Sequence, residues 1–219
     1  MSAKNNNPKG IILILLAMMV FSVQDSIMQY IYNFASLYEV YLIRSLVSFV
    51  IILLFLKLTK KPIIFKTQYP LLTFCRVILF FFGFSFFYVS LTVLPLGTAT
   101  ALFFVTPFLI TIFAKFFLKE QIGPRRWSAV IIGFVGSLIV IRPGFIEFNL
   151  ASVAALGTGF FYGIYLVITR KLHTSDNPLL TLLLTGVVGA AIGSFLVPVV
   201  WINPTFNQWS LLALMGIFA

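Results

Sequence analysis

Three ionisable side chains lie inside long apolar runs of the sequence, and these are the residues that could do chemistry. Asp25, Arg44 and Arg76 each interrupt a different run. A charge at the centre of a membrane costs roughly 2.5–3.5 kcal/mol on insertion scales, so such groups often mark substrate or ion pathways. These three side chains are therefore the first candidates for a functional site in this sequence.

Asp25 and Arg44 fall at a similar predicted depth. Along their helices, Asp25 is about 22 Å from the inner face and Arg44 about 6–9 Å below the outer face. In a core of about 30 Å, both lie in the outer third, so an ion pair between them is geometrically possible. The pair could belong to a transport site or only hold two helices together. Helical spacing places Met18, Ser22, Asp25 and Gln29 on one side of the first helix, and Tyr41, Arg44 and Ser48 on one side of the second. These two stripes could face each other and line a cavity.

The other candidates have structural as well as functional interpretations. Arg76, about 8 Å from the inner face, could snorkel to water, pair with Glu120 or bind an anionic substrate group. Glu39 is expected to be a solvated acid at the outer interface rather than a gate. Tyr88 and Tyr162, together with Tyr165, are candidate cavity aromatics, since aromatic faces attract flat or cationic ligands.

Several residues are expected to shape helices rather than to bind. Pro107 should kink its helix, as a packing feature or a hinge, with Thr106 and Thr111 helping to satisfy the freed carbonyls. Small residues at four-residue spacing predict close helix contacts within one bundle rather than dimerisation. They are Ala155, Gly159 and Gly163 in one run, and Gly189 and Gly193 in the next.

Composition assigns the chain to membranes. Apolar residues make up 61% and charged residues 9% of 219 positions, with a mean hydropathy of +1.09, whereas soluble domains carry about a quarter charged residues. The net charge of +10 comes from short loops, which is typical of an orientation signal and not of a nucleic-acid surface. The expected partners are the lipid bilayer and a small-molecule substrate, and the oligomeric state stays open.

Signs of an enzyme are missing from the sequence. Cys75 and His173 are the only cysteine and histidine, too few for a metal site. Phosphate-binding GxxxxGK[ST], HExxH and GxSxG motifs are absent. We therefore expect no catalytic residues, no metal and no cofactor.

Apolar runs alternate with short polar breaks along the whole chain. The expected spans are 10–30, 40–56, 71–91, 97–117, 127–141, 153–169 and 179–200, with an eighth that begins at Trp209. Eleven basic residues lie in one set of alternate segments and only Arg142 in the other. The positive-inside rule then predicts a multi-pass inner (plasma) membrane protein with a cytoplasmic N-terminus.

An internal repeat organises these spans. The segments that begin at Gln68 and at Gln208 are similar and lie 140 residues apart. This offset predicts two five-helix repeats of opposite orientation, a common plan of secondary transporters. We expect a cytoplasmic tail over 1–9, a first repeat over 10–141 and an incomplete second repeat over 142–219. The expected fold is an all-α, ten-helix inverted-repeat bundle, truncated here after about seven and a half helices, so the chain is expected to be a fragment.

The stretch LTVLPLGTATALFFVTPFLITIFAKFFLKEQIGPRRWSAVIIGFVGSLIVIRPG resembles the EamA-type drug/metabolite transporters. The order and spacing of Pro107, Lys119-Glu120, Trp127, Gly133 and Gly136 carry the resemblance. It implies ten helices in two repeats.

Further features resemble the branch of this family that includes S-adenosylmethionine-uptake carriers. They are Asp25, Glu39, Arg44 and Arg76. The sequence departs from the repeat at Leu166, which aligns with Asp25, so any role of a second-repeat acid is absent.

Three functions remain open at this point. The first is a secondary transporter of a small metabolite, S-adenosylmethionine-like, cofactor-like or amino-acid-like, that works by alternating access. The second is a membrane enzyme on lipid-like substrates, which would need a cluster of His, Asp or Cys that the chain lacks. The third is a non-transporting membrane scaffold or fragment.

Overall fold

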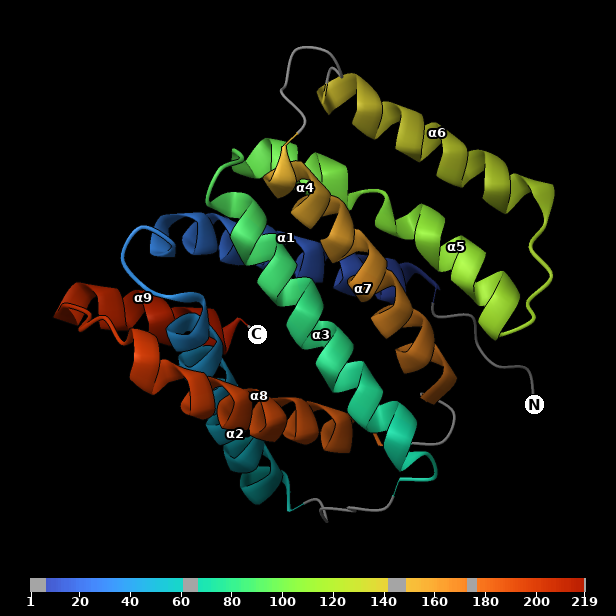
Figure 1. Ribbon diagram of the computed structural model, residues 1–219. Coiled ribbons are helices and arrows are strands. Elements are labelled where there is room, and N and C mark those ends of the chain that lie inside the picture. Colours follow the sequence, from blue (N-terminus) through green and yellow to red (C-terminus); the bar gives the residue numbers. More distant parts are fainter. Residues whose placement is uncertain (1–6, 61–66, 142–148, 173–176, 219) are drawn as a thin grey trace.

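The computed structural model describes residues 7–60, 67–141, 149–172 and 177–218, and the regular elements in these ranges are all α-helices (Figure 1). They are α1 Asn7–Ile31, α2 Leu37–Thr59, α3 Pro70–Leu91, α4 Leu96–Phe103, α5 Thr106–Phe117, α6 Pro124–Ile141, α7 Leu150–Leu172, α8 Pro178–Val200 and α9 Phe206–Ile217. His173 and Arg142, named above, lie outside the described residues.

Each predicted run coincides with a helix or a helix pair. Among the described residues, five stretches are long and apolar enough to cross a membrane, and α8 contributes a shorter apolar stretch. The five are Gly10–Ile31, Leu37–Thr59, Pro70–Leu91, Leu96–Phe117 and Leu150–Leu172. The apolar side chains of residues 11–21 on α1 are exposed, as lipid-facing side chains must be. The all-α membrane bundle is confirmed.

The helices pack around α2, α3 and α7. Figure 1 shows α3 and α7 side by side through the middle of the bundle, with α2 and α8 in contact on one side. The α4 and α5 helices pack against both α6 and α7, so that α6 forms the opposite edge. The α9 helix packs against α2 and α1.

The buried core lies at one end of this bundle. It joins the C-terminal ends of α1 and α3 to the N-terminal ends of α2, α4 and α7, with α9 against them. Its buried members include Met28, Ile31, Phe87, Tyr88, Leu91, Leu212 and Met215. Because consecutive helices run in opposite directions, alternate loops meet at this end.

Glycines let α8 approach α2 closely, as the small-residue spacing predicts. A Cβ built on Gly193 would lie 2.7 Å from the Cβ of Leu42, and one on Gly186 would lie 3.1 Å from the Cβ of Phe49. Both contacts are within this chain, in line with packing inside one bundle.

The predicted kink at Pro107 is present as a break between α4 and α5. The helix ends at Phe103 and restarts at Thr106. Pro107 has no N–H to give to the carbonyl of Phe103, and the hydroxyl of Thr106 donates to that carbonyl instead, at 2.5 Å. The Thr111 hydroxyl donates to the carbonyl of Pro107 one turn later, at 2.8 Å. Gly159 of α7 packs against this break, where its Cβ would lie 3.1 Å from the Thr106 hydroxyl.

Candidate functional site

Arg44 is the charged side chain around which the candidate site is built. It lies on α2, is only 8% exposed, and faces α3. Its guanidinium carbon lies 5.2 Å from the ring centre of Phe80 and 4.9 Å from that of Phe84. These rings are four residues apart and therefore share one face of α3. Cation–π contact with two rings offsets part of the cost of burying the guanidinium.

Tyrosines from two helices complete the surroundings of Arg44. Tyr41, one turn before Arg44 on α2, has its ring 5.3 Å from that of Phe84. From α7, Tyr165 lies 5.3 Å from Phe80, and Tyr162 lies 5.3 Å from Tyr165. These rings continue those beside Arg44 because α3 contacts both α2 and α7. Of the aromatics expected from the sequence, Tyr165 contacts Phe80 beside Arg44, and Tyr162 contacts Tyr165 in turn.

The aromatic surface continues from Tyr162 to α4. Phe103 lies 5.5 Å from Tyr162 and 6.1 Å from Phe87, ring centre to ring centre. Phe103 is also the last residue of α4 before the break. The site therefore adjoins the interrupted helix.

The ion pair expected between Asp25 and Arg44 does not form. Between described residues, Glu120 pairs with Arg126 and with Arg170, and no ion pair joins Asp25 to Arg44. Asp25 is half-buried on α1. The expectation rested on depth alone, whereas the direction of the Arg44 side chain is set by its packing against α3.

Several buried polar atoms near these elements have no hydrogen-bond partner within the described part of the protein. They are Nε of Arg44, the hydroxyl of Tyr41, Oε1 of Gln24 and the hydroxyl of Ser85. Sequence reasoning missed Gln24, which is 5% exposed on α1, and Ser85 on α3. Their polar type inside apolar runs was the signal that could have identified them. Native structures rarely leave such atoms unpartnered, so each of them could take a hydrogen bond from or to a water or a solute.

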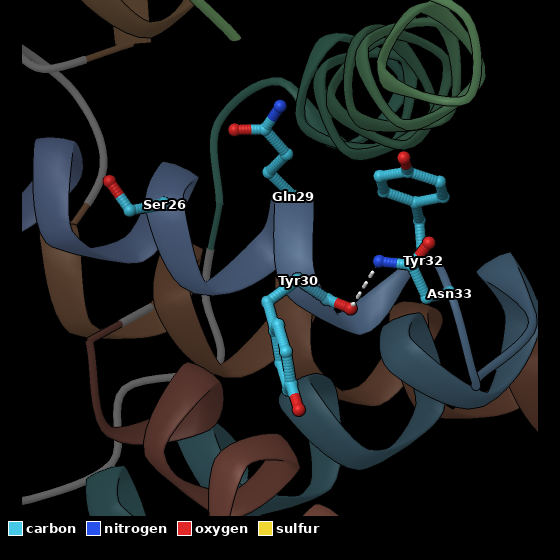
Figure 2. Close-up of a pocket in the computed structure, with 5 residues that line it drawn as sticks. All are labelled: Ser26, Gln29, Tyr30, Tyr32 and Asn33. Carbon is cyan, nitrogen blue, oxygen red and sulfur yellow. Dashed lines mark hydrogen bonds between the residues drawn. The ribbon is translucent and has the colours of Figure 1, made fainter. Parts of the chain in front are cut away.

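The polar stripe expected on α1 is buried only in part. Ser22 is exposed, and its carbonyl accepts from the Ser26 hydroxyl at 2.9 Å. Gln29 lines an open depression of about 320 Å³ near the end of α1. Its other lining residues are Ser26 and Tyr30 of α1 and Tyr32 and Asn33 of the turn that follows, and Figure 2 shows Tyr30 and Tyr32 pointing to different sides. Asn33 there donates to the carbonyl of Tyr30 at 3.1 Å.

Glu39 and Tyr88 have structural roles at the buried end of the bundle, and the expectation of a solvated Glu39 is wrong. Glu39 is 0% exposed. Its Oε2 accepts from the N–H of Ser36, closing a capping box at the start of α2, and its Oε1 accepts from the N–H of Ile202, both at 2.7 Å. The hydroxyl of Tyr88 donates to the carbonyl of Ala35. Burial demands these partners, because an unpaired carboxylate there would be very costly.

Arg76 and Glu120 are not partners. Arg76 is 1% exposed, which excludes the snorkelling interpretation. Glu120 pairs with Arg170 of α7 at 3.1 Å and with Arg126 of α6 at 3.4 Å. Glu120 therefore connects the start of α6 to the end of α7. Gly163 lies about two turns before Arg170 on α7, against Leu109 and Phe113 of α5.

No group of three or more His, Cys, Asp or Glu side chains that could hold a metal occurs among the described residues. Around the guanidinium of Arg44 there are instead flat rings, together with the Nε of Arg44 and the hydroxyl of Tyr41, which have no hydrogen-bond partner among the described residues. This arrangement is suited to binding a small organic solute.

Comparison with known proteins adds family evidence. The profile of the EamA-like transporter family matches residues 8–142. The chain is 27% identical to an S-adenosylmethionine uptake transporter of Rickettsia prowazekii, over 94% of this chain and 70% of that protein. It is 31% identical to a riboflavin transporter of Vibrio cholerae, over 81% of this chain and 61% of that protein. A solved crystal structure shares its fold, with a TM-score of 0.68 and 15% identity over 92% of this chain and 74% of that one.

Proposed function

The chain belongs to the EamA-like transporter family, and from this premise we propose that it carries a small metabolite with a flat ring by alternating access. It is a multi-pass membrane protein of a small-metabolite transporter family. The observation that carries the finer proposal is the buried guanidinium of Arg44 held between the rings of Phe80 and Phe84. A buried cation with an unpartnered Nε and aromatic neighbours offers both a hydrogen bond and ring contacts to a small solute.

The proposed substrate is S-adenosylmethionine-like, cofactor-like or amino-acid-like. Relatives are named for S-adenosylmethionine and for riboflavin, and both molecules contain a flat heteroaromatic ring. The aromatic side chains around Arg44 suit such a ring, since stacked and edge-on ring contacts add about 0.5–1.5 kcal/mol each. Tyr162, Tyr165 and Phe103 are the proposed ring contacts.

Two inverted repeats are proposed to supply the alternating motion. The first repeat covers 10–141, and 142–219 is part of the second. The packing of the helices supports this division. In this scheme α1 corresponds to α7, α2 to α8 and α3 to α9. If the two repeats exchange places, the contact of α3 with α7 becomes the contact of α9 with α1, and the contact of α2 with α8 is unchanged. All three contacts occur. Such exchange is what a twofold axis in the membrane plane produces.

Within this scheme the N-terminus is cytoplasmic, Asp25 and Arg44 lie toward the outer side of the cavity, and Arg76 lies toward the inner side. The break between α4 and α5 is the proposed hinge. It is flanked by Phe103 of the site and by Gly159 of α7, so movement there would reach the bound ring.

The test is uptake of radiolabelled S-adenosylmethionine by cells that express the chain, with unlabelled riboflavin, amino acids and nucleosides as competitors. Saturable uptake that Arg44→Ala abolishes, in a variant that still reaches the membrane, is the expected result. If no labelled member of this panel is taken up or exported above the background of cells without the chain, the proposed function is wrong.

A further inference from the structure

Polar contacts join the two proposed repeats at opposite ends of the bundle. At the buried end, Oε1 of Glu39 on α2 accepts from the N–H of Ile202, which lies between α8 and α9, at 2.7 Å. At the opposite end, where α7 finishes, Glu120 pairs with Arg170 at 3.1 Å. Between these ends, Ser48 lies halfway along α2, and its hydroxyl donates to a carbonyl of α9 at 3.0 Å. The contacts between the repeats are therefore spread over the whole height of the bundle.

The two carboxylates at these ends have different surroundings. Glu39 is 0% exposed, and its two oxygens accept from the backbone N–H groups of Ser36 and Ile202. Its position in the first turn of α2 adds the favourable field of a helix N-terminus. Glu120 keeps 26% of its side-chain surface exposed and Arg170 keeps 55%, so water competes for that ion pair. Of the two contacts, the one that Glu39 makes depends on a dry, closed end.

We propose, on the basis of the alternating motion described above, that Glu39 is the latch of a gate at the buried end, a contact that exists only while that gate is closed. The structure is the closed state. When the gate opens, α9 and the segment that carries Ile202 move away from α1 and α2, and water replaces the N–H of Ile202 at the carboxylate. The bond to Ser36 stays, because Ser36 and Glu39 belong to the same helix start.

The apolar contacts of the gate lie between the same elements. Met28 of α1 and Leu212 and Met215 of α9 belong to one buried cluster, in which α1 packs against α9. Apolar burial is non-directional, so these contacts alone allow α9 to close in more than one register. A buried carboxylate is costly unless it is hydrogen-bonded. Glu39 therefore specifies one closed arrangement, in which Ile202 supplies a partner for its second oxygen.

The experiment measures how fast a fluorescent maleimide labels a cysteine at the gate of the purified full chain in detergent. Met28→Cys, in a chain that also carries Cys75→Ala, places the thiol at a side chain that is 2% exposed, so labelling is slow while the gate is closed. Glu39→Gln should increase the labelling rate about fivefold or more. An amide has one acceptor oxygen for two N–H groups, which weakens the closed state relative to the open one, where water serves both. Glu120→Gln makes the same change at the opposite end and should not increase the rate.

A backbone change tests the same hydrogen bond from its donor side. Ile202→Pro removes the N–H donor and leaves Glu39 and its helix cap intact. Trp201 already has the extended backbone, with φ −65° and ψ 127°, that a residue before proline requires. We expect Ile202→Pro to speed the labelling of Met28→Cys as much as Glu39→Gln does. Ile202→Ala keeps the N–H and should leave the labelling rate unchanged.

The native Cys75 distinguishes gate opening from general loosening of the bundle. It lies near the start of α3, at the end away from the gate, and in chains without Met28→Cys its labelling should not increase in either variant. Equal increases at both positions would show loosening and overturn the latch. Unchanged labelling of Met28→Cys in both Glu39→Gln and Ile202→Pro would overturn it as well. The labelling needs no substrate, so an increase at Met28→Cys alone, in a chain that takes up and exports nothing, would refute the proposed function while supporting the latch.

Discussion

Replacing Gly159 by alanine tests whether the break between α4 and α5 is held in place by α7. The new Cβ would lie 2.7 Å from Cγ1 of Val105 and 3.1 Å from the hydroxyl of Thr106. Neither atom can retreat easily. Val105 is β-branched and stiff at χ1, and the Thr106 hydroxyl is held by the carbonyl of Phe103 at 2.5 Å.

The expected cost follows from two opposing effects. Forcing one extra carbon into a packed contact costs about 1–3 kcal/mol. Removing a glycine from a helix interior returns about 0.5–1 kcal/mol. The midpoints of these two ranges differ by about 1 kcal/mol, so Gly159→Ala should lower the Tm of a chain of this size by about 2–4 °C.

Two other glycines provide matched controls for this measurement. A Cβ at Gly163, one turn along α7, would lie 3.5 Å from the Cβ of Leu109, an ordinary contact. A Cβ at Gly136 on α6 would have nothing within 4 Å. Thermal unfolding in detergent, followed by fluorescence-detected size exclusion, should rank Gly159→Ala below both control variants. Equal Tm values for Gly159→Ala and Gly163→Ala would refute the idea that α7 is in tight contact with the break.

Three further changes probe the buried end, the break and the site. Glu39→Ala leaves the N–H groups of Ser36 and Ile202 without their acceptor. It should destabilise the fold by about 2–4 kcal/mol. An unchanged Tm would mean that water replaces the carboxylate. Thr106→Val keeps the side-chain shape but removes the donor to Phe103, so a loss of about 1–2 kcal/mol is expected in the same unfolding assay. Asp25→Asn should abolish uptake in a protein that folds and reaches the membrane, and normal uptake would remove Asp25 from the site.

Local sequence patterns predicted the helices well. Apolar runs near the length of a membrane crossing became α1, α2, α3 and α7, because the backbone of a chain in lipid has to satisfy its own hydrogen bonds. The break at Pro107 was predictable for the same local reason, since proline lacks the N–H that the helix needs. The capping box of Ser36 and Glu39 also depends on a local spacing of three residues, but it was not predicted, because Glu39 was expected to be a solvated acid.

Side-chain partners across the bundle could not be read in the same way. Depth along two helices put Asp25 and Arg44 at one level, but depth does not specify the rotation of each helix. The structure turns Arg44 toward Phe80 and Phe84 of α3. It also joins Glu39 to Ile202, 163 residues away, which no spacing rule indicates.

By itself, the sequence determined that this protein is a helical membrane bundle with few buried charges and a broken helix at Pro107. These properties follow from hydropathy, charge placement and backbone chemistry, all of which are local. Only the tertiary structure decided that Arg44 lies against the rings of α3, which continue onto α7, and that no ion pair joins it to Asp25. Those outcomes depend on how neighbouring helices rotate and pack, because in lipid helices associate through the shapes and hydrogen bonds of facing side chains.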